Sequence, residues 1–72
     1  MKQTINATFS NGKSITRKSV KSFGFAWFAK NKWQSDTGFA STKESAEKYA
    51  KTRFNGTESP TQEWEVVETS VA

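Results

Sequence analysis

The chain has 72 residues, enough for one small domain around a single hydrophobic core. It contains three tryptophans, one tyrosine and six phenylalanines, but no leucine, cysteine or histidine, so aromatic side chains must replace an aliphatic core. Without cysteine and histidine there are no disulfides, thiolate nucleophiles, Ser-His triads or cysteine-based zinc sites. The four scattered glycines form no phosphate-binding loop. We therefore expect a protein that is not an enzyme and that uses no cofactor or metal.

The formal net charge of +4 is distributed unevenly along the chain. Residues 35–72 have a net charge of −3, from four basic and seven acidic side chains. Residues 1–34 have no acid and seven basic side chains: Lys2, Lys13, Arg17, Lys18, Lys21, Lys30 and Lys32. Such asymmetry favours a partner that the basic half attracts, either nucleic acid or an acidic protein surface. Alternatively, the two halves neutralise each other: if the last strand lies beside the first, Glu63 and Glu65 form cross-strand pairs with lysine side chains.

The first elements in chain order are two strands joined by a tight turn. Residues 2–9 alternate between polar and apolar, with Ile5, Ala7 and Phe9 on one face, which predicts a half-buried strand. Asn11-Gly12 then predicts a type I′ turn in which both residues have positive φ. Residues 13–18 return as a second strand with Ile15 inward.

Two further strands and a turn follow. Residues 23–30 are rich in aromatics, with Phe23, Phe25 and Trp27 expected on one face and residues 24, 26 and 28 on the other. Lys30-Asn31-Lys32 indicates a turn. Residues 33–40 are expected to form a fourth strand, with Gly38 as a bulge or a point of close approach.

The second half begins with a helix, expected over residues 42–54. Ser41 and Glu44 have the spacing of a capping box, and Asn55-Gly56 suits the end of a helix. The apolar stripe of this helix comprises Ala46, Tyr49, Ala50 and Phe54. A last strand is expected over residues 63–69, with Trp64 and Val66 inward, followed by frayed residues.

This order of elements defines the expected fold. Residues 1–72 should form one α+β domain, with a four- or five-stranded, mostly antiparallel sheet in the order β-β-β-β-α-β. One helix should pack on one face of that sheet.

The segment 21–28, KSFGFAWF, resembles the RNP1 box of RNA-recognition domains and the related segment of cold-shock domains. The resemblance implies that Phe23 and Phe25 stack on bases. It also implies phosphate contacts from a set of basic side chains: Arg17, Lys18, Lys21, Lys30 and Lys32. The alternative is that Phe23, Phe25 and Trp27 build the core. Both cannot hold on one face, because the single helix covers only one face of the sheet.

A longer stretch, from Phe9 to Trp27, resembles short proteins encoded by phages and prophages. In these proteins a hairpin of the form F-x-[DN]-G-x-x-[IV]-T-R leads into a basic, aromatic segment that ends in Ala-Trp, followed by a helix and a final strand. The resemblance implies a small binding protein that blocks a host component, as anti-CRISPR and other anti-defence inhibitors do.

Two groups of residues are candidates for partner contacts. Lys13, Arg17, Lys18 and Lys21 form a basic strip on the predicted hairpin, although such a strip can also serve only as a solvated face. Trp33 is expected in the core, but an exposed Trp33 beside Lys30 and Lys32 would indicate an interface anchor.

The main hypothesis is thus a non-enzymatic inhibitor that binds a host protein or nucleoprotein complex through its basic half. The alternative is a protein that binds single-stranded nucleic acid through the aromatic strand. No apolar run is long enough to cross a membrane and the N-terminus has no signal peptide, so we expect the cytoplasm, of the host cell if a phage encodes the chain. We expect a monomer or a small homo-oligomer, without a membrane partner.

Overall fold

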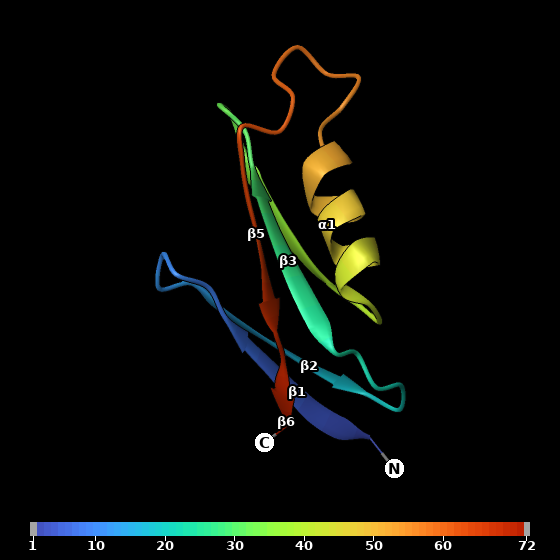
Figure 1. Cartoon of the computed structure of the whole chain (residues 1–72). Coiled ribbons are helices and arrows are strands. Elements are labelled where there is room, and N and C mark those ends of the chain that lie inside the picture. Colours follow the sequence, from blue (N-terminus) through green and yellow to red (C-terminus); the bar gives the residue numbers. More distant parts are fainter. Residues whose placement is uncertain (1, 72) are drawn as a thin grey trace.

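The computed structural model describes residues 2–71, which fold into two antiparallel three-stranded sheets and one helix (Figure 1). The first sheet has the strand order β2-β1-β6 and the second β4-β3-β5. The elements are β1 (Gln3–Thr8), β2 (Ser14–Ser19), β3 (Phe25–Lys30), β4 (Ser35–Ala40), α1 (Lys43–Thr52), β5 (Glu63–Glu68) and β6 (Ser70–Val71).

The C-terminal segment links the two sheets. β5 pairs with β3, and after Thr69 the chain continues as β6, which pairs with β1. Thr69 fixes this crossing point, because its N–H donates to the Gly24 carbonyl at 3.0 Å and its hydroxyl donates to the Phe23 carbonyl. The α+β class, the antiparallel pairing and the helix on one face are confirmed. The prediction of a single four- or five-stranded sheet is wrong, because β1 and β2 pack against a face of the second sheet and do not pair with its strands. Residues 70–71, expected to fray, pair with β1 as β6.

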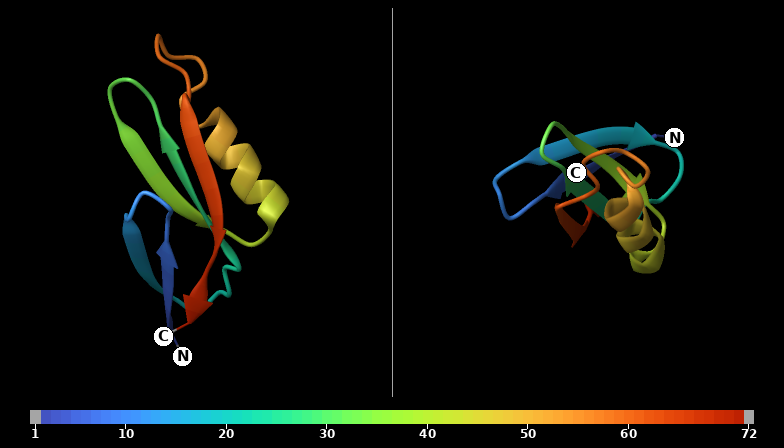
Figure 2. Two further views of the ribbon diagram at one scale, coloured as in Figure 1. Left: turned by 60° about the vertical axis from the view of Figure 1, so that its left-hand side comes forward. Right: turned by 90° about the horizontal axis from the view of Figure 1, so that it is seen from above.

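β3 is buried on both faces, and this explains its aromatic sequence. α1 lies along one face of the second sheet, and the first sheet packs against the other face (Figure 2). The cluster on the helix side contains Trp27, Ala29, Ala40, Ala46, Ala50 and Phe54, with Phe25 and Val66 packed against it. The cluster between the sheets contains Ala7, Phe9, Ala26 and Phe28, with Ile15, Phe39 and Val67 packed against it.

Small residues let large aromatics fit on the helix side. Ala46 and Ala50 face the sheet and are fully buried. On β4, a Cβ at Gly38 would lie only 2.6 Å from three atoms of the Trp27 indole. The prediction of a close approach at Gly38 is therefore confirmed, and the approaching group is Trp27.

The hairpin between β1 and β2 differs from the predicted type I′ turn. Only Gly12 has a positive φ, of 89°, and Asn11 does not. Gly12 N–H donates to the Phe9 carbonyl and Phe9 N–H to the Lys13 carbonyl, so Ser10, Asn11 and Gly12 form a three-residue loop. This is a type I turn followed by a left-handed glycine, the usual arrangement for three-residue hairpins.

The helix is shorter than predicted at both ends. Thr42, not Ser41, is the N-cap, because its side chain accepts a hydrogen bond from Ser45 N–H at 3.1 Å. The capping box with Glu44 is therefore wrong by one residue. At the other end the helix gives way to a turn at Arg53, and Gly56 adopts its positive φ of 92° three residues later.

Within residues 2–71, the helix is too short and too polar to cross a membrane.

Candidate functional site

The proposed stacking pair, Phe23 and Phe25, does not lie on one open face. Phe25 packs against the helix-side cluster. Phe23 precedes β3, and its ring lies 6.2 Å from that of Phe39, a residue that packs against the cluster between the sheets. The expected common face of Phe23, Phe25 and Trp27 is thus wrong for Phe23, because β3 begins only at Phe25. The two rings point to different sides of the second sheet and cannot hold adjacent bases.

The basic strip of the hairpin also divides between two faces of the first sheet. Lys13 and Arg17 lie on the side of the second sheet, with the Lys13 ammonium 5.6 Å from the centre of the Phe28 ring and the Arg17 guanidinium 5.1 Å from that of Phe23. Lys18 alternates to the outer face, where it lies opposite Thr4. Lys21 lies beyond the end of β2 and is exposed. All four cations therefore follow one edge strand but point in different directions.

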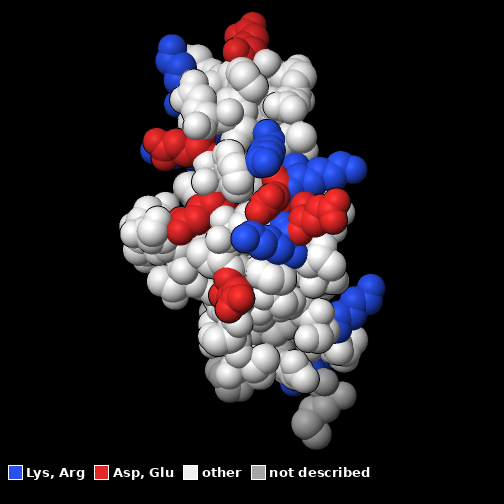
Figure 3. Space-filling model, in the orientation of Figure 1, with Lys and Arg blue, Asp and Glu red and all other residues white. Residues whose placement is uncertain are grey.

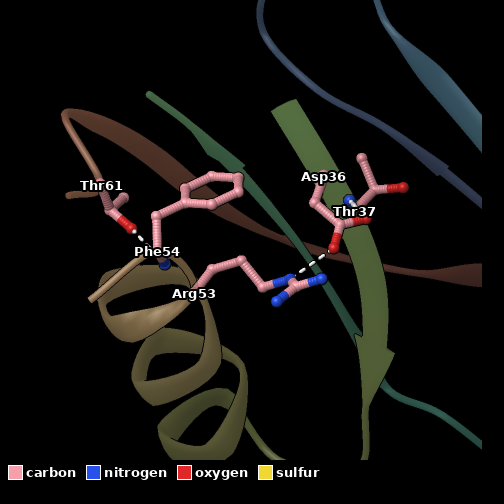
Figure 4. Close-up of polar contacts among 5 residues, drawn as sticks. All are labelled: Asp36, Thr37, Arg53, Phe54 and Thr61. Carbon is pink, nitrogen blue, oxygen red and sulfur yellow. Dashed lines mark hydrogen bonds and ion pairs between the residues drawn. The ribbon is translucent and has the colours of Figure 1, made fainter. Parts of the chain in front are cut away.

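These cations have no acidic neighbour in their own sheet. β1, β2 and β6 contain no Asp or Glu. The one ion pair among residues 2–71 joins Arg53 to Asp36 on the helix side of the second sheet (Figure 4). The expected neutralisation by the last strand does not occur as ion pairs. Glu63 lies opposite Lys30 without pairing, and Glu65 accepts hydrogen bonds from Ser10.

Charge on the face seen in Figure 3 is mixed rather than segregated. Blue and red side chains lie close together over the middle of the molecule, and the lower part is largely white. The elements here include α1, which carries both signs, and β5, which carries three glutamates. The positive half of the sequence therefore does not form one continuous patch on this face.

Trp33 projects from the turn between β3 and β4 and is 71% exposed, so its expected place in the core is wrong. The condition for an interface anchor is met instead, because Lys30 and Lys32 are also exposed and the Lys32 ammonium lies 5.0 Å from the centre of the indole. This turn and Lys21 lie at opposite ends of β3.

Asn31, only 3% exposed, holds the turn in place. Its side-chain oxygen accepts from Trp33 N–H at 2.9 Å and from Gln34 N–H at 2.7 Å. Its side-chain nitrogen donates to the Ser59 carbonyl at 2.7 Å, and the Ser59 hydroxyl accepts from Lys32 N–H at 3.1 Å. The sequence marks Asn31 only as a turn residue, because nothing local shows that Ser59, 28 positions later, lies beneath it.

Trp64 is the second tryptophan expected in the core, and it is 42% exposed. The Lys51 ammonium of α1 lies 4.9 Å from the centre of its ring. Val66, two residues on, packs against the helix-side cluster as predicted. The expected core position is thus wrong for Trp64, which lies on the helix side of β5 but at the margin of the helix.

An open hollow of about 510 Å³ lies between the hairpin tip and β5, and no sequence motif indicated it. Ser10 and Asn11 line one side, Phe28 contributes to the lining, and residues 62–65 complete it. Ser10 spans the hollow, since its N–H and hydroxyl donate to the Glu65 carboxylate at 2.9–3.1 Å. Residues 2–71 contain no group of acidic side chains that could hold a metal ion.

No family model, no curated protein and no solved structure matches this chain. The candidate binding surfaces are therefore the edge of the first sheet, with its four cations, and the turn that carries Trp33.

Proposed function

We propose that this chain is a small, non-enzymatic binding protein of the phage type, which inhibits a host protein or nucleoprotein complex by covering part of its surface. The contact surface is the cationic edge, defined as Lys13, Arg17, Lys18 and Lys21. The observation that carries this proposal is that these four exposed cations line a sheet without any acidic side chain, and none forms an ion pair with a described residue.

Unpaired cations on an edge strand suit recognition of an acidic surface. They keep their full charge for a partner, steer its approach and fix its orientation. Charges on β2 also discourage pairing of this edge with another copy of itself. Two of the four cations, Lys13 and Arg17, are positioned over aromatic rings, which reduces the side-chain entropy lost on binding.

An acidic protein surface fits this edge better than stacked bases do. Phe23 and Phe25 point to different sides of the second sheet, so the segment that resembles RNP1 offers no paired platform for bases. The edge therefore offers positive charges without a stacking surface, and such charges suit the carboxylates of an acidic protein.

A charge-reversal experiment tests the proposal. Tagged wild-type chain is incubated with a nuclease-treated bacterial extract, in parallel with Lys18→Glu/Lys21→Glu and the control Lys43→Glu/Lys48→Glu. Both variants change the net charge equally, and all four lysines are exposed. We expect a specific host protein to be retained by the wild type and the control but not by the edge variant. Equal retention by all three chains contradicts the proposal.

Inhibition is tested in cells. A phage restricted by a host defence system should form more plaques on cells that express the wild-type chain or the control than on cells that express the edge variant. If none of the chains changes plaque formation, or any defined activity of the captured protein, the inhibitory part of the proposal is wrong.

A further inference from the structure

The turn at residues 31–34 carries the exposed indole of Trp33 and has more hydrogen bonds than a hairpin needs to close. We propose that Trp33 is a stacking site for one base of single-stranded nucleic acid, with Lys30 and Lys32 as phosphate contacts. This site is separate from the cationic edge and does not depend on the function proposed for it.

Buried side chains hold the backbone beneath the Trp33 indole in place. Two residues are enough to close a hairpin, whereas here the buried Asn31 accepts two hydrogen bonds from within the turn. Two more hydrogen bonds join the turn to the buried Ser59. The exposed ring is thus attached to a fixed turn, so less conformational entropy is lost when a ligand stacks on the ring.

The two faces of the Trp33 indole are not equivalent. The Lys32 ammonium lies over the ring, 5.0 Å from its centre, and covers one face. Because Trp33 is 71% exposed, a flat ring can stack on it from the other side, and no pocket encloses the whole side chain. A base stacked there would have its backbone phosphate within the reach of nearby lysines.

Trp64 is the other partly exposed tryptophan with a lysine over its ring. Trp64 lies between Glu63 and Glu65 in sequence, and these carboxylates would repel a phosphate backbone. The turn at Trp33 contains no acid from Lys30 to Ser35, although Glu63 lies opposite Lys30 across β3 and β5. Of the two indoles, Trp33 therefore has the surroundings that fit an anionic strand.

The partner must be single-stranded, because the faces of bases in a duplex are occupied by their neighbours. Base stacking on an aromatic side chain depends little on sequence, so DNA and RNA should both bind, with a preference that the experiment measures.

The test is a titration of the chain with a fluorescein-labelled oligothymidylate of about ten nucleotides at about 20 mM salt. The same titration uses an oligouridylate and a duplex of equal length. We expect binding of the single strands, quenching of tryptophan fluorescence, and a loss of affinity of about 5- to 150-fold in Trp33→Ala. Trp33→Phe should retain part of the affinity, and Lys32→Ala should lower the slope of log affinity against log salt by about 1.

Trp64→Ala is the matched control, and circular dichroism shows whether each variant is folded. The proposal is overturned if the wild type does not bind either single strand, if Trp33→Ala binds as well as the wild type, or if Trp64→Ala loses as much affinity. It is also overturned in favour of a protein anchor if Trp33→Ala abolishes capture of a host protein while oligonucleotides do not bind. These results leave the test of the cationic edge intact, because that test depends on Lys18 and Lys21.

Discussion

β3 and the turn that follows it place two tryptophans, six residues apart, in opposite environments. Trp27 is 8% exposed and Trp33 is 71% exposed. Trp27 lies against the backbone of Gly38, and its ring centre is 6.5 Å from that of Tyr49 on α1. Trp33 lies beyond the end of the strand, where its backbone N–H donates to Asn31 and its ring contacts the Lys32 ammonium. The neighbours in the fold, not the residue type, decide which tryptophan belongs to the core.

The two regions are also ordered by different forces. β3 is fixed by apolar packing on both faces, which depends on the fit of large rings against alanine and glycine. The turn is fixed by hydrogen bonds to the buried Asn31 and Ser59. Substitutions in the strand should therefore act on global stability, whereas substitutions in the turn should act locally or on binding.

The largest effect is expected for Trp27→Ala. Loss of a large buried ring costs about 3–5 kcal/mol, through lost transfer energy and the cavity left behind. A domain of this size has only on the order of 3–5 kcal/mol of net stability, so the variant should be largely unfolded. Circular dichroism during urea titration measures this. A cooperative transition at the wild-type midpoint would show that Trp27 is not central to the core.

Gly38→Ala should cause the next largest loss of stability, about 3 kcal/mol, which is the upper end of the usual cost of overpacking a core. The new methyl group would lie 2.6 Å from the indole of Trp27, which is enclosed and cannot easily move. Gly24→Ala is the matched control, because the nearest atom to its methyl group, the Ser41 carbonyl oxygen, is 3.7 Å away. Thermal unfolding should separate the two variants clearly. Equal stabilities would mean that Trp27 does not pack on Gly38.

Asn31→Ala should cost about 2 kcal/mol, because it removes three hydrogen bonds at a buried site. Its effect should be largest at the turn, where Trp33 should become more mobile. Tryptophan fluorescence anisotropy measures this mobility. Each chain is measured with and without the additional substitution Trp33→Phe, and the difference between the two gives the contribution of Trp33, because Trp27 and Trp64 are present in both. Asn55→Ala, at an exposed asparagine, serves as the control. Unchanged anisotropy in Asn31→Ala would contradict the proposed support.

Arg53→Gln should lower the free energy of unfolding by a smaller amount, about 0.5 kcal/mol. This small effect is expected even though the partner of Arg53, Asp36, lies on β4 beside the helix-side cluster. Both side chains are more than a third exposed, so water and salt weaken their attraction. Urea unfolding at low and high salt measures this, and the difference from the wild type should shrink as salt is added. A loss of several kcal/mol that persists at high salt would show that the pair is structural.

The sequence was a good guide wherever local pattern decides structure. Alternation placed Ile5, Ala7 and Phe9 on one buried face, and helical spacing identified Ala46 and Ala50 as the residues facing the sheet. Close approach at Gly38 could also be predicted, although its partner could not.

Features that depend on distant contacts could not be predicted. Pairing of residues 70–71 with β1 requires the crossing at Thr69, which local patterns do not indicate. The separation of Phe23 from Phe25 follows from the start of β3 at Phe25, one boundary that periodicity locates poorly. Of the candidate site residues, Lys32 and Trp33 do come together, with Lys30 at the adjoining end of β3. The cations on the hairpin divide between two faces of the first sheet.

The smallest effect on stability should come from Trp33→Ala, the counterpart of Trp27→Ala in the turn. An exposed side chain whose removal leaves no cavity should change the free energy of unfolding by no more than about 0.5 kcal/mol. Its backbone N–H, which Asn31 accepts, is retained in the variant. Urea unfolding should thus give a midpoint close to that of the wild type. Such a result would separate the two tryptophans by function, since a large exposed aromatic that adds nothing to folding is free to serve a partner. A large loss of stability would instead place Trp33 in the core and remove the basis for a stacking site there.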